Sequence, residues 1–512
     1  MLSARKRLSF HDAGSAFDRL RGEGKKIVQC HGTFDLLHPG HIVHFEEAKR
    51  LGDVLVVTVT AEGHVSKGPG RPYFNDELRV KYLSSLEYVD YVVVIPFPSA
   101  VEAIECVRPN IYCKGKEYKN HQNDVTGNIL DDVKTTERLG GMVYYVGSVV
   151  FSSTRLLNNH FDVHPPEMKE FCRILADKYT PKQFRDIVED FGDLKVLIIG
   201  DVIFDRYSSV RVQGLTSKNR ILSARFLSEE SQAGGALAVF RHIKQFTANV
   251  RLIGLVGTEE WVDPALGAYL NPAEDGVMRI PGFTTIIKQR FVEPQSEGKE
   301  LSKLFAINAI NEQRLDDKAQ ALVREVINDC IKDYDLVMVM DFGHGLMQKD
   351  IRDLVQEKAP FLALNCQTNS YNHGFNIIDK QYTRADSFSL DEMELTLACS
   401  RRNINFCEEL GKLRDKFSSR YGWLTRGGAD TIGIKGEYKC ECMSFEQSVV
   451  DTVGAGDAFC SVASMAAVKN LPVDLATFMG QLAGAQAVKI IGNSDSIKKN
   501  KFLKSGMALL SF

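Results

Sequence analysis

The sequence predicts an α/β protein with two doubly wound domains, each built on a largely parallel sheet between helices. Three observations lead to this class. Short, β-branched apolar runs recur along the chain, two of them run directly into a string that contains Gly and Asp, and segments of helical pattern alternate with the runs. The length of 512 residues also exceeds that of one ordinary domain.

The first domain is assigned to residues 1–157. A buried strand is expected over 26–30, where KIVQC leads into HGTFD, and further strands are expected over 54–60 and 91–97. Residues 46–51 have a helical pattern. Strands of a parallel sheet are covered on both faces, so they read as continuous apolar runs of this kind.

A helical linker is predicted over residues 158–193, because this stretch is charged and mostly helical in pattern. Thr180 and Pro181 suit a helix start, with a capping side chain followed by proline at the first helical position. The second domain, residues 194–512, should then contain the remaining strands, which are expected over 195–200, 250–257, 336–343 and 422–428.

Composition and charge exclude several classes of function. The formal net charge of −3 argues against nucleic acid as a partner, and no apolar run is long enough to cross a membrane. The eleven scattered cysteines are read as reduced thiols, and a secretory signal is not recognised. The expected localisation is therefore cytoplasmic.

The string HGTFDLLHPGH, residues 31–41, carries the first chemical signal. It follows a strand and opens a helix, where backbone N–H groups and the helix dipole favour a phosphate. His38 and His41 are three residues apart, so both can face one point and donate to an α-phosphate. A lone His-x-x-His could also be a metal pair, but the complete string favours phosphate chemistry.

This string resembles the cytidylyltransferase-like family, in which G-x-F-D precedes H-x-G-H, and the resemblance covers about residues 7–157. It implies transfer of a nucleoside monophosphate from ATP or CTP, and the base is left open. His38 and His41 are the expected catalytic residues. The nucleotide and phosphate contacts that the resemblance implies are Gly32, Thr33, Phe34, Lys67, Arg79, Lys114, Ser152, Ser153, Thr154 and Arg155.

The string DTVGAGDAF, residues 451–459, resembles the signature of ribokinase-type sugar kinases. Gly454, Ala455 and Gly456 at a helix start would form an anion hole for the γ-phosphate of ATP. Asp457 would accept the proton of the attacking sugar hydroxyl.

Other parts of residues 194–512 resemble the same family. Asp201, Asp205, Gly234 and Gly235 match its sugar side, and Thr425 and Gly427 match its ATP side. Asp391 and Glu394 stand where the family orders Mg²⁺ and phosphate, so an indirect role through phosphate or water is expected.

Residues 194–512 depart from the family pattern at three single positions and one three-residue segment. Ala238 stands at an asparagine position, His344 at a lysine position and Asp391 at an asparagine position, while Asn365-Cys366-Gln367 replaces Asp-Pro-Lys. Either the kinase takes a different acceptor, which we favour because the GAGD string is intact, or its activity is weakened.

Taken together, the two halves resemble the bifunctional heptose-7-phosphate kinase/heptose-1-phosphate adenylyltransferase family with the domain order reversed. This implies a bifunctional enzyme of nucleotide-sugar synthesis that acts on a sugar phosphate and requires Mg²⁺. The kinase step would use ATP, and the transferase step would use ATP or CTP. Relatives of both halves often form homodimers, so a homodimer is a possible assembly. The alternatives are a monofunctional nucleotidylyltransferase with a kinase-like domain for binding or oligomerisation, and a nucleotide-sensing regulator.

Overall fold

The computed structural model describes residues 5–119, 128–147, 153–161, 164–293, 302–311, 315–369, 371–446 and 448–512. The chain forms two compact units, one of residues 1–185 with 503–512 and the other of residues 186–502. This division differs from the predicted ranges, because residues 158–185 and 503–512 both pack with the first unit. Within the described residues, no helix has both the length and the apolarity that a membrane span requires.

The first unit is built on a six-stranded, entirely parallel sheet in the order β1-β4-β3-β2-β5-β6. The order reverses direction between β2 and β5, which is where ligands bind in doubly wound sheets. The strands are β1 (Arg7–Leu8), β2 (Ile27–Gly32), β3 (Val54–Thr60), β4 (Tyr91–Ile95), β5 (Ile111–Gly115) and β6 (Met142–Val146).

Helices of this unit connect the strands and follow the sheet. They are α2 (Phe10–Gly22), α3 (Pro39–Lys49), α4 (Asp76–Ser84), α5 (Val101–Val107), α6 (Asn128–Arg138), α7 (Ser153–His160), α8 (Pro166–Lys178) and α9 (Pro181–Glu189), the last of which runs into the second unit. As predicted, α9 begins at Pro181, and the Thr180 hydroxyl accepts from the Gln183 N–H at 3.2 Å.

Alternating side chains of the parallel strands fill two cores, one on each face of the sheet. Val57 of β3 packs with Phe45 of α3 in one core, while its neighbour Val56 packs with Phe17 of α2 in the other. The predicted strand over 54–60 is therefore confirmed as β3, with all seven residues buried.

The second unit contains a nine-stranded sheet in the order β11-β10-β7-β14-β15-β16-β17-β18-β19, parallel except at β17-β18 and β18-β19. A separate four-stranded sheet has the order β13-β12-β8-β9. The strands of the large sheet are β7 (Val196–Gly200), β10 (Val250–Val256), β11 (Asp275–Arg279), β14 (Leu336–Asp341), β15 (Leu362–Cys366), β16 (Ser387–Asp391), β17 (Tyr421–Thr425), β18 (Asp430–Lys435) and β19 (Tyr438–Met443).

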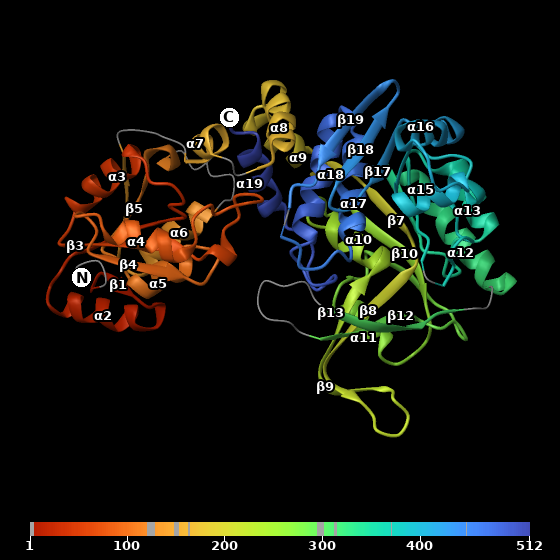
Figure 1. The fold of residues 1–512 in the computed structure, drawn as a ribbon, viewed down its shortest axis with the longest axis horizontal. Coiled ribbons are helices and arrows are strands. Elements are labelled where there is room, and N and C mark those ends of the chain that lie inside the picture. Colours follow the sequence, from red (N-terminus) through yellow and green to blue (C-terminus); the bar gives the residue numbers. More distant parts are fainter. Residues whose placement is uncertain are drawn as a thin grey trace. The chain divides into compact units, whose positions relative to one another are not determined.

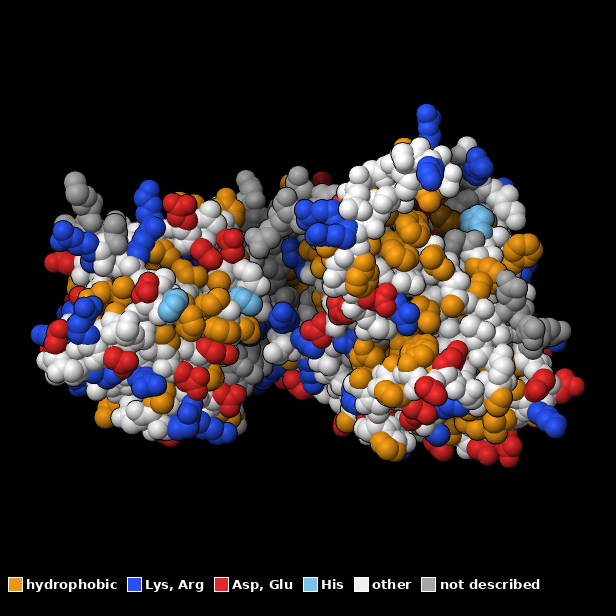
Figure 2. All heavy atoms as spheres, turned by 90° about the horizontal axis from the view of Figure 1, so that it is seen from below, with side chains coloured by type: hydrophobic (Ala, Val, Ile, Leu, Met, Phe, Trp, Pro, Cys, Tyr) orange, Lys and Arg blue, Asp and Glu red, His pale blue; other side chains and the backbone are white. Residues whose placement is uncertain are grey.

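The four-stranded sheet leaves apolar side chains in contact with solvent. Phe226 of β9 is 61% exposed and Ile307 of β13 is 54% exposed. Figure 2 shows apolar side chains scattered among charged ones on one face of this unit. The strands of this sheet are β8 (Val202–Leu215), β9 (Leu222–Gly234), β12 (Ile286–Glu293) and β13 (Ser302–Ala309).

Helices cover the nine-stranded sheet (Figure 1). Among them, α17 and α18 consist mostly of buried residues. They are α10 (Gly235–Ile243), α11 (Val262–Gly267), α12 (Asp317–Cys330), α13 (Lys349–Lys358), α14 (Ile378–Gln381), α15 (Glu392–Cys399), α16 (Phe406–Phe417), α17 (Ala455–Val468) and α18 (Val473–Ala487). The last helix, α19 (Lys499–Leu509), ends in the first unit. The prediction of two α/β sheets is confirmed, whereas the separate four-stranded sheet was not predicted.

Candidate active sites

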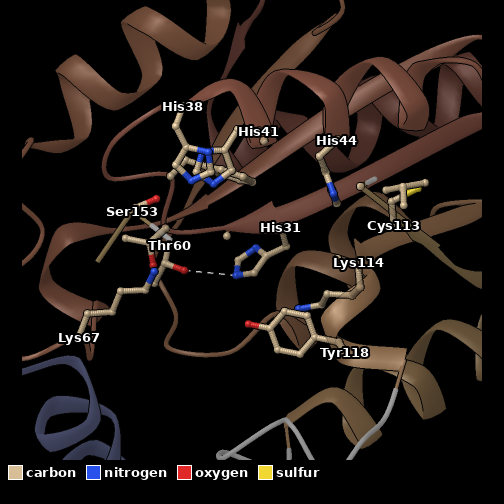
Figure 3. Close-up of a pocket in the computed structure, with 17 residues that line it drawn as sticks. His31, His38, His41, His44, Thr60, Lys67, Cys113, Lys114, Tyr118 and Ser153 are labelled. Atoms are coloured by element: carbon tan, nitrogen blue, oxygen red, sulfur yellow. Dashed lines mark hydrogen bonds between the residues drawn. The ribbon is translucent and has the colours of Figure 1, made fainter. Parts of the chain in front are cut away.

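A cavity of about 300 Å³ opens at the carboxyl ends of β2 and β5, at the reversal point of the first sheet. Figure 3 shows its labelled side chains, with His38 and His41 stacked above and Lys67 and Lys114 on opposite sides below. The imidazole centroids of the two histidines are 3.9 Å apart. The structure therefore brings together the predicted residues that line this cavity, which are Gly32, Thr33, Phe34, His38, His41, Lys67, Lys114 and Ser153.

The start of α3 places the two histidines. His38 is the N-cap residue with an extended backbone (φ −144°, ψ 167°), and Pro39 at the first helical position continues the chain into the helix. The His41 N–H donates to the His38 carbonyl at 2.9 Å, which fixes their spacing. His38 and His41 therefore project into one cavity from a single helical turn.

The loop between β2 and α3 is held from below by α4. Arg79, which is fully buried, donates to the Thr33 carbonyl at 2.7 Å, and the Tyr82 hydroxyl donates to the carbonyls of Phe34 and Asp35. Phe34 has a positive φ of 45° and its ring lies edge-on to His41. Arg79, predicted as a phosphate contact, thus lies beneath the loop and outside the residues that line the cavity.

Burial sets the charge of the histidines in this cavity. It lowers the pKa of His38, and burial together with the nearby His38 and Lys67 lowers the pKa of His41 to about 3. Both rings are therefore neutral near pH 7, and each carries one N–H that can donate to a phosphate oxygen. Neutral imidazoles suit a site that must also hold positively charged lysines.

The two lysines have different surroundings. Burial, and then the charge of Arg71, lowers the pKa of Lys67 to about 8. Lys114 lies 3.0 Å from the Asp132 carboxylate, which offsets part of its charge. The charge of Lys67 therefore changes as the pH passes through about 8.

Of the predicted Ser-Ser-Thr-Arg segment, residues 152–155, Ser153 lines the cavity. The Ser153 hydroxyl donates to the Leu36 carbonyl at 3.2 Å and so ties the start of α7 to the β2–α3 loop. Thr154 and Arg155 lie on α7 but are not among the described residues that line the cavity. Ser152 lies outside the described residues.

Sequence reasoning missed a second set of polar groups in this cavity. His31 lies between Thr58, at 3.0 Å from Nδ1, and Thr60, at 3.2 Å from Nε2, and burial lowers its pKa to about 3. His44 lines the same cavity one turn after His41. Thr60 ends a parallel strand next to β2, and this position could have indicated that it lies at the ligand site.

A second cavity, of about 230 Å³, lies at the start of α17. It is lined by several predicted residues, namely Asp391, Glu394, Thr425, Gly454, Gly456 and Asp457. Gly454 is the N-cap of α17 with φ 82°, and a Cβ there would lie 2.3 Å from the Asn493 side chain, so this position requires glycine. Ala455 is the first residue of the helix, and Gly427 lies in the turn after β17 with φ 57°.

Gln367 and Asn365 support the Asp457 carboxylate. From the sequence, both are identified only as departures from the family pattern. Gln367 Nε2 donates to Asp457 Oδ1 at 2.8 Å and to Asn365 Oδ1 at 2.8 Å. Asn365 in turn donates to Ser389 Oγ and to its carbonyl, each at 3.2 Å. Burial raises the pKa of Asp457 to about 6, against the lowering effects of the Gln367 hydrogen bond and the Lys288 charge.

The predicted sugar-side residues form a group around β8. Asp205 pairs with Arg290 and accepts from Asn493 Nδ2 at 3.1 Å. A Cβ on Gly234 would lie 2.3 Å from Asp205 Oδ2, and Gly235 has φ 54°, so both positions require glycine. From the sequence alone, Arg290 is assigned no role.

Three further positions on the sugar side, Asp201, His344 and Ala238, are buried. Asp201 Oδ2 accepts the N–H groups of Phe342 at 3.0 Å and His344 at 3.1 Å, and burial and the nearby Asp341 raise the pKa of Asp201 to about 7. His344 is buried, with its pKa lowered to about 4 by burial, and Ala238 lies buried in α10.

Asp391 and Glu394 form a capping box at the start of α15. Asp391 Oδ1 accepts from the Glu394 N–H at 2.8 Å, and Glu394 Oε2 accepts from the Asp391 N–H at 2.9 Å. Glu394 Oε1 accepts from the Thr368 N–H at 3.1 Å. Three of the four oxygens are therefore used by the backbone, and in the described part of the chain no group of three or more His, Cys, Asp or Glu residues is placed to hold a metal ion.

Two family models match the chain at these two sites. Residues 30–157 match the cytidylyltransferase-like model, and residues 392–500 match the model of the pfkB family of carbohydrate kinases. The chain thus combines a nucleotidyltransferase-type domain with a carbohydrate kinase-type domain, in that order.

Particular relatives are similar to a smaller part of the chain. The bifunctional protein HldE of Desulfatibacillum aliphaticivorans is 40% identical over 148 residues, which are 28% of this chain and 29% of the relative. HldE of Aliarcobacter butzleri is 38% identical over 136 residues, or 26% and 28% of the two chains. These matches fall on the cytidylyltransferase-like domain. The chain therefore spans less than a third of the length of these curated relatives.

Among solved structures, similarity is found with phosphofructokinase-2 from Escherichia coli in complex with fructose-6-phosphate, at 11% identity and a TM-score of 0.49. Ribokinase from Arabidopsis thaliana, complexed with ribose and ATP, is 17% identical with a TM-score of 0.48. Each comparison covers 62% of this chain and 99% of the other.

Proposed function

We propose that the chain is a bifunctional enzyme of nucleotide-sugar synthesis. One site transfers a nucleoside monophosphate from ATP or CTP to a sugar 1-phosphate, and the other phosphorylates a sugar or sugar phosphate with ATP. The observation that carries the first activity is the stacked His38–His41 pair, which faces one cavity together with Lys67 and Lys114. The resemblance of the chain to the heptose-7-phosphate kinase/heptose-1-phosphate adenylyltransferase family favours an acceptor like a heptose 1-phosphate, and the bifunctional HldE proteins are similar to the chain over this domain.

The transferase step needs no covalent intermediate on the protein. A phosphate oxygen of the sugar 1-phosphate attacks the α-phosphorus of the nucleotide, a new P–O bond forms, and the bond to the β-phosphate breaks with release of pyrophosphate. The N–H groups of His38 and His41 stabilise the charge that develops on the α-phosphate oxygens, and Lys67 neutralises the leaving pyrophosphate. The start of α3 and the loop that carries Lys67 hold these groups in place before the substrates arrive.

The kinase step uses the carboxylate at the start of α17. Asp457, with a pKa of about 6, is largely ionised at pH 7 and can accept the proton of an attacking sugar hydroxyl. That oxygen then bonds to the γ-phosphorus of ATP, and ADP leaves. The N–H groups at the start of α17 point toward the transferred phosphate, where the helix dipole adds stabilisation.

Both activities require a divalent cation, and the residues at the second site fit Mg²⁺ held mainly by phosphates. When bound, Mg²⁺ would neutralise charge on the β- and γ-phosphates. Asp391 and Glu394 line the Asp457 cavity, but the capping box uses most of their oxygens. Their contact with the ion would therefore pass through water or phosphate.

A screen for pyrophosphate release tests the transferase proposal. ATP, CTP, GTP and UTP are each combined with a panel of sugar 1-phosphates, and we expect release with ATP or CTP only. His41→Asn should reduce release by at least about 100-fold, because it removes a donor to the transition state. The exposed His11→Asn variant is the control. If the wild type releases no pyrophosphate with any pair, the transferase proposal fails.

Reciprocal variants test the kinase proposal in the same chain. Asp457→Asn should abolish ADP formation with a panel of sugars and sugar phosphates and should leave pyrophosphate release intact. His41→Asn should do the reverse, so each variant controls for the folding of the other.

The monofunctional alternative keeps a specific observation in its favour, because Ala238 and His344 alter the sugar side and both are buried. If the wild type and Asp457→Asn are equally inert across the sugar panel while pyrophosphate release persists, this alternative replaces the bifunctional one.

A further inference from the structure

The segment 503–512 belongs to the first compact unit, although the preceding residues 186–502 form the second. Its apolar side chains are integrated into that unit, because Leu503, Leu509 and Leu510 are each at most 3% exposed. The segment is therefore a part of the nucleotidyltransferase-type unit that lies more than 300 residues away from it in sequence.

The Asn158 side chain of helix α7 forms hydrogen bonds with this segment. Asn158 Nδ2 donates to the Ala508 carbonyl and to the Ser511 carbonyl, each at 2.8 Å. Asn158 is only 4% exposed, so both hydrogen bonds are protected from water. Carbonyls at the end of a helix lack partners within the helix, and here the Asn158 amide supplies one to Ala508. The same helix begins at Ser153, which lines the transferase cavity.

The loop that carries Lys67 lies against the same segment. Gly68 has φ 97°, and a Cβ on it would lie 3.6 Å from the Ser505 Cα, which is van der Waals contact. Figure 3 shows a blue helix from the last part of the chain directly below Lys67. Lys504 precedes Ser505, and its charge contributes to the lowered pKa of Lys67.

Two of the elements that carry predicted phosphate contacts, the Lys67 loop and α7, thus rest on one segment. We propose that residues 503–512 complete the phosphate-binding end of the transferase site, with Asn158 as a positioning residue for α7. This inference rests on the proposed transferase function. It assigns the site a component that neither the HGTFDLLHPGH string nor the N-terminal domain contains.

Ligand binding to the full chain tests the proposal independently of turnover. Calorimetric titrations with magnesium pyrophosphate and with MgATP and MgCTP should show weaker binding for Asn158→Ala than for the wild type. Unchanged binding by Asn158→Ala, or a wild type that binds none of these ligands, overturns the proposal.

Hydrogen exchange tests the positioning role of Asn158. In Asn158→Ala, backbone amides of residues 65–70 and 153–160 should exchange faster together, and KM for the nucleotide should rise more than kcat falls. Asn159→Ala, at an exposed neighbour, is the matched control. If the two segments keep their exchange rates in Asn158→Ala, the segment does not position them. Wild-type ligand binding without turnover would instead refute the proposed reaction and leave this inference standing.

Discussion

Lys67 is the residue whose ionisation should shape the pH dependence of the transferase. Its pKa of about 8 lies below the ordinary lysine value because of burial and nearby cations, so Lys67 is charged below pH 8 and loses that charge above it. We therefore predict that kcat/KM for nucleotidyl transfer falls as pH rises through about 8. Lys67→Arg should abolish this fall, since arginine stays charged. Profiles of pyrophosphate release between pH 6 and pH 10 decide the point, and an unchanged fall in Lys67→Arg would assign it to another group.

Gln367 should set the acid limb of the kinase profile. Its hydrogen bond lowers the pKa of Asp457, although burial keeps that pKa raised to about 6. In Gln367→Met the lowering contact is lost, so the pKa of Asp457 should rise and the acid limb of kcat/KM for ADP formation should move to higher pH. Gln381→Met, in the same unit, should leave the limb in place. A lower rate without any shift of the limb would mean that Gln367 has only a structural role.

The start of α17 is the element on which the kinase proposal depends, and its N-cap glycine differs from a glycine in the turn after β17 in what it tolerates. Gly454→Ala should destabilise the second unit by about 1–2 kcal/mol from the left-handed backbone alone, and the 2.3 Å approach to Asn493 should add to this cost. Gly428→Ala, where a Cβ would meet nothing within 4 Å, should change stability by less than about 0.5 kcal/mol. Urea unfolding of both variants gives the comparison, and equal stabilities would contradict it.

Elements with strong local patterns could be predicted from the sequence, whereas the support of the sites could not. The strand over 54–60 and the helix start at Pro181 were recognised because periodicity and capping are local properties. The Gln367–Asp457 bond joins residues 90 positions apart, and a family pattern had marked Gln367 only as a departure. Likewise, Arg79 matched a phosphate contact by its place in the sequence, yet its guanidinium bonds the Thr33 carbonyl beneath the loop.

At the scale of the whole molecule, each unit has its own sheet, core and candidate site, so the chain should unfold in two calorimetric transitions. Buried Leu→Ala substitutions assign them, since each costs about 2–5 kcal/mol. Leu55→Ala in β3 should lower the transition of the first unit, and Leu475→Ala in α18 should lower that of the second.

The decisive variant is Leu509→Ala, because Leu509 is 3% exposed and lies in the segment 503–512. If the chain divided by sequence order alone, Leu509→Ala would lower the unfolding transition of the second unit. Because the neighbouring Ala508 and Ser511 carbonyls accept hydrogen bonds from Asn158, the substitution should instead affect the transition of the first unit. We therefore expect Leu509→Ala to lower the same transition as Leu55→Ala in scanning calorimetry. A shift of only the transition that Leu475→Ala lowers would return the segment to the kinase-type unit and remove the basis for its role in the transferase site.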